Sequence, residues 1–284
     1  MKKKTLGFTL AESLIAIVIG MISVAAAFSA YNYFNKSYAS ISQKAAISKS
    51  AREALSMIAR DLRNAGYIDP NFVGNSNEGL SQSQSEERLI NVKNKENNYS
   101  GKYRQSDHLI VWYTTSAKDR KQVMYYLKKY SNSSDYYLLR DVTYNPMWSG
   151  TTNPVREELF VPFVEDFQII LKKKDGSILS PVCFFCSSFE NSRGGQSQGI
   201  KNMKDVHTAE IYLTVRSPKE VYSKARRTKI QNGESPHGSN ITIPADKYHR
   251  ETFFVSVHTR NLATPQVKIA SSGQSIGIGT GYNK

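Results

Sequence analysis

The chain has 284 residues and a formal net charge of +14, and hydrophobic residues make up 39% of it. This length accommodates one membrane or stalk segment together with one sizeable globular domain. Only two cysteines are present, which excludes a disulfide-stapled scaffold and a four-cysteine zinc site. The basic balance fits either a solvated basic surface or an anionic partner such as nucleic acid, lipid or an acidic polymer.

A basic leader and an apolar run form the N-terminus. Three lysines lie within residues 1–7, and the apolar run 8–30 follows with Glu12 as its only formal charge. At a rise of about 1.5 Å per residue, a helix over 8–30 is roughly 34 Å long and can cross a bilayer. The lysines predict that residues 1–7 stay in the cytoplasm and that the remainder of the chain is directed outward.

Three interpretations of this N-terminus compete: a secretory signal peptide cut near Ala27, a plain signal anchor, and a prepilin leader cut between Gly7 and Phe8. Glu12 distinguishes them, because a carboxylate at the bilayer centre costs about 2.5–3.5 kcal/mol and less near its edge. Only the prepilin interpretation offers a compensating gain. Cleavage creates an α-amino group at Phe8, and in a filament Glu12 can pair with such an amine on a neighbouring subunit.

The segment KKKTLGFTLAESLIAIVIG, residues 2–20, resembles the type III signal sequence of type IV prepilins. The resemblance implies cleavage after Gly7, N-methylation of the new first residue Phe8, and a role for Glu12 in assembly. Many major pilins carry a proline in the middle of this helix, and this segment has none. Its absence favours a minor pilin or a pseudopilin.

The helix is expected to continue beyond the membrane as an amphipathic half over 31–66. No glycine or proline occurs from Ser37 to Ala65, and Gly66 is suited to cap the helix end. Apolar residues recur at spacings of four and three, whereas the charged residues, Asp61 among them, are expected on other faces. The stripe comprises Ala51, Leu55, Ile58, Leu62 and Ala65. Residues 50–67, SAREALSMIARDLRNAGY, resemble the end of the long helix of PilW-like minor pilins and of J-type minor pseudopilins.

Residues 67–270 are predicted to form a β-rich globular domain, and residues 271–284 a flexible tail. Alternating or continuous apolar runs predict six strands: Leu109–Thr114, Gln122–Lys128, Tyr136–Val142, Val164–Leu171, Thr208–Val215 and Thr252–Thr259. The polar stretches 70–106 and 217–244 are interpreted as loops. The expected fold is therefore α+β and pilin-like, with a long N-terminal helix packed on an antiparallel β-sheet.

Two further groups of residues are site candidates. Cys183 and Cys186 form a CxxC in a predicted loop, where a local disulfide is favoured over a redox pair because the domain faces an oxidising compartment. Arg226, Arg227 and Lys229 form a basic cluster that could contact a DNA backbone or a surface polysaccharide. We find no catalytic, metal-binding or cofactor-binding pattern, so an enzyme is not expected.

The resemblance implies a minor pilin that promotes initiation and assembly of a type IV pilus at or near its tip. Its expected partners are the prepilin peptidase, other pilins through the N-terminal helix, and an inner-membrane assembly platform. The expected location is the inner membrane in a single pass, and then the pilus on the cell surface. Open alternatives are a minor pseudopilin of type II secretion, a DNA-binding pilin for uptake, and a soluble secreted protein cut near Ala27.

Overall fold

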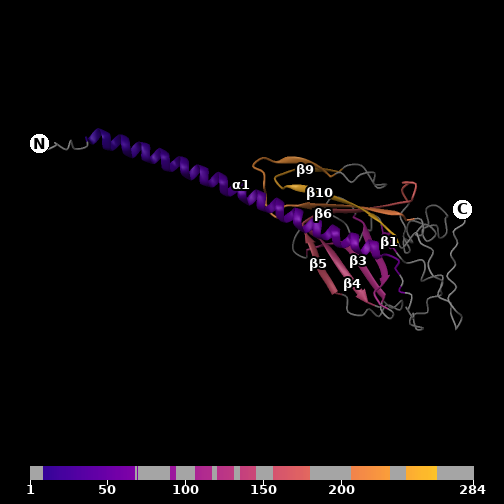
Figure 1. The fold of residues 1–284 in the computed structure, drawn as a ribbon. Coiled ribbons are helices and arrows are strands. Elements are labelled where there is room, and N and C mark those ends of the chain that lie inside the picture. Colours follow the sequence, from indigo (N-terminus) through magenta and orange to yellow (C-terminus); the bar gives the residue numbers. More distant parts are fainter. Residues whose placement is uncertain are drawn as a thin grey trace, which may run out of the picture. The chain divides into compact units, whose positions relative to one another are not determined.

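The computed structural model describes residues 9–67, 69, 90–93, 106–116, 120–130, 135–144, 156–179, 206–230 and 241–260. Gly7, Phe8, Cys183, Cys186 and the predicted tail lie outside the described residues. The chain divides into two compact units, Met1–Ala46 and Ile47–Lys284. One helix, α1 (Leu10–Asn64), runs through the boundary between them (Figure 1). The prediction of a single long N-terminal helix is thereby confirmed.

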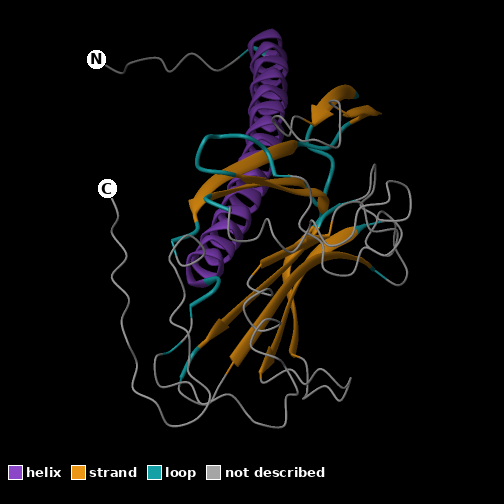
Figure 2. Ribbon diagram, turned by 90° about the vertical axis from the view of Figure 1, so that its right-hand side faces the viewer, coloured by secondary structure: helices purple, strands orange, loops and turns teal. Residues whose placement is uncertain are grey.

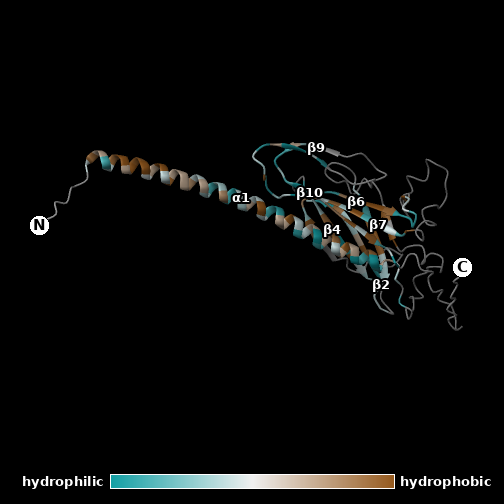
Figure 3. Cartoon of the chain, turned by 45° about the horizontal axis from the view of Figure 1, so that its top comes forward, coloured by the Kyte–Doolittle hydropathy of each residue, from teal (hydrophilic) through white to brown (hydrophobic). Residues whose placement is uncertain are grey.

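Within the first unit, α1 starts with a mostly apolar stretch (Figure 3), and its apolar side chains are exposed on every face. Leu10 is 80% exposed, Met21 67% and Phe28 65%. The hydroxyls of Ser23 and Ser29 donate to the backbone carbonyls of residues four positions earlier, both at 2.9 Å. The polar groups of these serines are thus satisfied within the helix, as a segment surrounded by apolar groups requires.

In the second unit, α1 buries the predicted stripe: each of its five members is at most 5% exposed. The helix ends at Asn64, and Gly66 adopts a left-handed φ of 76°, as expected of a C-terminal cap. The prediction for Asp61 is wrong, since this carboxylate is buried and only 3% exposed. It lies three residues after Ile58, so helix periodicity places it beside the apolar stripe.

The strands that the structure describes form three antiparallel sheets rather than the single predicted sheet (Figure 2). Their neighbour orders are β1-β2-β3-β4-β5, β10-β7-β6 and β8-β9. The strands are β1 (Ile90–Lys93), β2 (His108–Thr114), β3 (Arg120–Lys129), β4 (Tyr136–Tyr144), β5 (Arg156–Pro162), β6 (Val164–Lys172), β7 (Thr208–Arg216), β8 (Arg226–Ile230), β9 (Ile241–Asp246) and β10 (Arg250–His258).

All six predicted strands are present, and the described residues contain four further strands that the sequence analysis did not predict. β1 lies inside the stretch interpreted as loop 70–106, and both β8 and β9 lie inside loop 217–244. β5 also escaped prediction. These strands are short or rich in charged residues, and all four lie at the edge of a sheet or in a two-stranded ribbon, where polar side chains and proline are tolerated.

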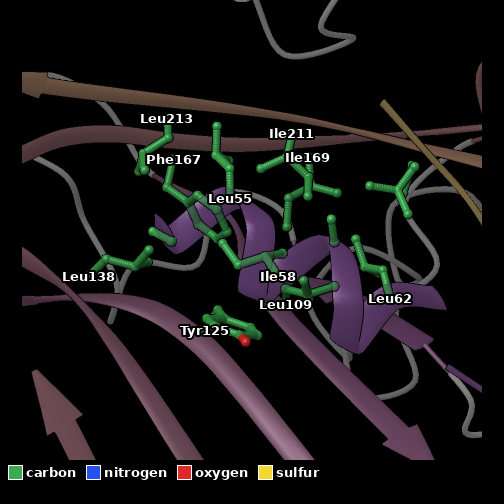
Figure 4. Close-up of a cluster of buried hydrophobic side chains, with 14 of the residues drawn as sticks. Leu55, Ile58, Leu62, Leu109, Tyr125, Leu138, Phe167, Ile169, Ile211 and Leu213 are labelled. Atoms are coloured by element: carbon green, nitrogen blue, oxygen red, sulfur yellow. The ribbon is translucent and has the colours of Figure 1, made fainter. Parts of the chain in front are cut away.

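The core of the second unit is built from three sources: the buried stripe of α1, the five-stranded sheet and the three-stranded sheet. Figure 4 shows Leu55 and Ile58 of α1 between Tyr125 and Leu138 of one sheet and Phe167 of the other. All five side chains are at most 5% exposed. The helix half that begins at Ile47 is therefore an integral part of the globular core.

Candidate functional site

The N-terminal end of α1 is organised by Thr9 and Glu12. The backbone N–H and the hydroxyl of Thr9 both donate to Glu12 Oε2 at 2.9 Å, and the backbone N–H of Glu12 donates to Thr9 Oγ1 at 3.3 Å. This reciprocal arrangement is a capping box, in which a threonine and a glutamate three residues later satisfy each other's backbone donors. The sequence analysis recognised the charge of Glu12 but not this capping role, although the pattern Thr-x-x-Glu signals it.

Glu12 remains open to further partners. Among the described residues it makes no ion pair, and its carboxylate is held only by Thr9, whose contacts are not charged. The next charged residue of α1 is Lys36, more than six turns along the helix. The local arrangement thus presents one negative charge at the start of a helix that exposes apolar side chains.

The part of the chain that the structure describes contains one helix long and apolar enough to cross a membrane, α1. Length and composition alone are weak support for a membrane span, because a signal sequence meets the same test. The exposure of the apolar side chains strengthens the support for a membrane span, because none of the apolar segment of α1 is buried by the rest of the protein. These side chains require lipid or another protein surface as their environment.

A second polar cluster, which the sequence analysis missed, lies inside the globular unit around Asp61. Tyr113 of β2 and Tyr125 of β3 donate their hydroxyls to the two carboxylate oxygens at 2.9 and 2.5 Å. Arg140 of β4 donates from Nη2 to Asp61 Oδ2 at 3.3 Å and from Nε to the Tyr125 hydroxyl at 3.1 Å. One helix residue is thereby bonded to three consecutive strands.

The electrostatics of this cluster follow from its burial. Burial raises the pKa of both Tyr113 and Tyr125 above the ordinary value, and the neighbouring Asp61 carboxylate raises it further. The two phenols therefore stay protonated and keep donating to Asp61. A signal for the cluster was present in the sequence. Arg140 alternates with Leu138 and Val142 in β4, so it occupies the same sheet face as these two buried residues.

The three sheets meet at a further ionic cluster. Arg250 donates from Nε to Glu165 Oε2 at 2.5 Å and from Nη1 to Asp246 Oδ1 at 2.6 Å. Arg216 forms ion pairs with Glu165, at 3.5 Å, and with Asp135. Asp135 precedes β4, Glu165 lies in β6 and Asp246 in β9, so these arginines join elements of all three sheets. Their positions at strand ends indicate a structural role.

The basic cluster predicted at residues 226–229 lies on β8 rather than in a loop. Arg226, Arg227 and Lys229 are all exposed. The guanidinium of Arg226 lies 4.6 Å from the centre of the Tyr222 ring. The candidate disulfide of Cys183 and Cys186 lies outside the described residues and stays a prediction. Within the described ranges, no group of three or more histidine, cysteine, aspartate or glutamate side chains could hold a metal ion.

Comparisons with known proteins bear on the N-terminus. Residues 2–28 match the family model described as the prokaryotic N-terminal methylation motif, and the matched range includes Gly7, Phe8 and Glu12. No curated protein matches the chain significantly. Among solved structures, a type IV-like pilin from Thermus thermophilus is similar, with a TM-score of 0.45 and 13% sequence identity. The similarity covers 76% of this chain and 97% of that one. The chain thus carries a prokaryotic methylation motif at the start of a long apolar helix.

Proposed function

We propose that the chain is a minor pilin of a type IV pilus, which promotes initiation and assembly of the filament at or near its tip. The prepilin peptidase cuts between Gly7 and Phe8, and the new N-terminus is methylated. The processing step follows from the methylation motif that residues 2–28 match. The role in a pilus rests on the chemistry of Glu12 and on the resemblance of residues 50–67 to PilW-like minor pilins.

The observation that carries the proposal is a carboxylate with no cationic partner in the described part of an exposed apolar helix. Glu12 is bonded by Thr9 alone, and the side chains around it, such as Leu10 and Ile15, are 80% and 60% exposed. Burying an unpaired carboxylate in an apolar environment is costly. A positive group delivered by a partner removes that cost, and a processed N-terminal amine on a neighbouring subunit is such a group.

The apolar side chains of the first unit serve two environments in turn. Before assembly, residues 8–30 hold the chain in the inner membrane, with the globular unit on the outer side as the lysines at positions 2–4 direct. After assembly, the same side chains pack against the helices of other pilins. This accounts for a helix that is apolar on all faces yet remains unburied within the subunit. An inner-membrane assembly platform is the expected place at which this helix segment passes from the membrane into the filament.

A minor pseudopilin of type II secretion would use the same leader, helix and carboxylate. Deletion of the encoding gene distinguishes a role in the pilus from a role in type II secretion. Loss of surface pili with normal protein secretion supports the pilus, whereas loss of secretion with normal piliation contradicts the proposal.

The charge of Glu12 can be tested separately from its capping function. Glu12→Gln keeps an oxygen that can accept from the Thr9 backbone N–H but removes the charge. Thr9→Ala removes the hydroxyl and keeps the charge. Leaving a buried charge without its partner costs about 3–5 kcal/mol. We therefore expect Glu12→Gln to be cleaved normally but to fall by at least about tenfold in sheared filaments.

Thr9→Ala is the matched control, because loss of a capping side chain costs only about 1 kcal/mol. It should enter filaments at close to the parent level. The cleaved fraction of each variant is read from the size of the chain in the membrane fraction, so a processing defect is seen separately. Normal incorporation of Glu12→Gln would refute the pairing, as would an equal loss in both variants.

A further inference from the structure

The two strands β8 and β9 form a ribbon that is separate from the N-terminal helix segment proposed to act in assembly. The two strands pair with each other and with no other described strand. Their register carries a bulge: Arg226 pairs with Asp246 and Thr228 with Ile243, so the extra residue lies in β9 and β8 stays regular. Side chains of β8 therefore alternate strictly between the two faces of the ribbon.

One face of the ribbon is turned toward the protein and the other toward solvent. Ile243 is fully buried, and its cross-strand partner Thr228 is half-buried. Arg227 and Lys229 alternate with Thr228 and are both exposed. They therefore share the outward face. Two residues on one face of a strand are about 6.7 Å apart, a spacing comparable to that of successive phosphates along a nucleic acid strand.

The positive charge of this face is not neutralised by the nearby carboxylates of the described residues. Glu220 pairs with Lys247 at 3.6 Å, and Asp246 is held by Arg250 at 2.6 Å. Neither Arg227 nor Lys229 forms an ion pair with a carboxylate in the described ranges. The guanidinium of Arg227 can donate two parallel hydrogen bonds to two oxygens of one phosphate.

The aromatic residue beside the ribbon is already occupied. The Tyr222 ring is covered by the Arg226 guanidinium at 4.6 Å, and its hydroxyl is hydrogen-bonded to His249 Nδ1 at 2.7 Å. This arrangement leaves Tyr222 unsuited to stack on an unpaired base or on a sugar ring. A ligand recognised through its backbone charges fits better, and the major groove of duplex DNA has room for a two-stranded β-ribbon.

We propose that the outward face of the β8–β9 ribbon, through Arg227 and Lys229, binds the phosphate backbone of duplex DNA without reading its sequence. The binding is electrostatic and weakens with salt, because each neutralised phosphate releases condensed counterions. It does not depend on Glu12 or on cleavage. A failure of this proposal therefore leaves the assembly proposal unaffected, and the reverse also holds.

The test uses the full chain in uncharged detergent micelles and a fluorescent DNA duplex of mixed sequence, with affinity measured between 50 and 200 mM salt. Removing two phosphate contacts lowers the slope of log affinity against log salt by about 1.8. We expect this change in the variant Arg227→Gln with Lys229→Gln. Over the fourfold salt range, the affinity of that variant should fall about 12-fold less than that of the parent.

Two control variants show whether position matters or charge alone. Lys129→Gln with Lys174→Gln removes two exposed charges elsewhere and should keep the parent slope. Arg227→Lys keeps the positive charge and should therefore also keep the parent slope. An unchanged slope in the Arg227 and Lys229 variant overturns the proposal, as does an equal change in the Lys129 and Lys174 variant. Tighter binding of polygalacturonate, an acidic polysaccharide, than of the duplex overturns the assignment to DNA.

Discussion

Asp61 bonds α1 to three strands of the five-stranded sheet, and its removal should destabilise the globular unit severely. Its carboxylate accepts hydrogen bonds from Tyr113 and Tyr125 and pairs with Arg140. The side chains of Asp61 and Arg140 are only 5% and 12% exposed. Asp61→Ala therefore breaks the buried ion pair with Arg140 and removes the acceptor of both tyrosine hydroxyls, and breaking a buried pair costs about 3–5 kcal/mol.

That loss corresponds to a fall in the midpoint of thermal unfolding of about 6–20 °C, at roughly 2–4 °C per kcal/mol for a domain of this size. The assay is urea and thermal unfolding of the full chain in detergent, followed by far-ultraviolet circular dichroism. Arg60→Ala is the matched control, since this neighbouring helix residue is exposed and surface changes usually stay within about 0.5 kcal/mol.

A double-variant cycle isolates the ionic part of the interaction. Arg140→Met combined with Asp61→Ala removes both charges of the ion pair, so neither charge is left without the other. We expect the double variant to lose about 1–3 kcal/mol less than the sum of the two single variants. Equal stability of Asp61→Ala and Arg60→Ala would refute the reasoning, and strict additivity would show that Arg140 does not pair with Asp61.

Two further predictions concern pH and the junction of the sheets. The pKa values of Tyr113 and Tyr125 are raised on folding. Their contribution to the free energy of unfolding is therefore complete below the unfolded-state pKa of about 10, and it is lost as the pH rises beyond that value. Unfolding measured from pH 8 to 11 should show this decline, and Tyr125→Phe should flatten it; the same decline in both chains would contradict the assignment. Arg250→Ala should cost about 3–5 kcal/mol, because it breaks the buried ion pairs of Arg250 with Glu165 and Asp246, and Glu165 keeps only the longer pair with Arg216 among the pairs described above. Lys247→Ala is its control, because Lys247 is only partly buried and its ion pair with Glu220 is open to solvent. A similar small effect in both would show that the junction is not held by this ion pair.

Much of the fold followed from simple periodicities in the sequence. The stripe from Ala51 to Ala65 predicted the buried face of α1, and the apolar runs predicted β2, β3, β4, β6, β7 and β10. The strands that escaped prediction are those in which pairing, rather than apolar content, decides the structure. β8 reads Arg-Arg-Thr-Lys-Ile and forms because its backbone pairs with β9.

The N-terminal methylation motif over residues 2–28 was predictable from the order of residues alone. The contacts of the polar side chains were not. The Asp61 cluster was missed because charged residues of an amphipathic helix were assigned to solvent, and its partner Arg140 is 79 residues away. Only the folded arrangement of α1 on β4 brings these two charges together, because nothing in the local sequence of either element specifies the pairing.

The central claim is that processing places a free amine at Phe8 and that Glu12 then finds such an amine on a neighbouring subunit. Mass spectrometry of the N-terminal peptide from sheared, washed filaments tests it most directly. We predict a peptide that begins with N-methylated Phe8. A chain that begins at Phe28 or Tyr31, or one that retains residues 1–7 in the filament, would contradict the account.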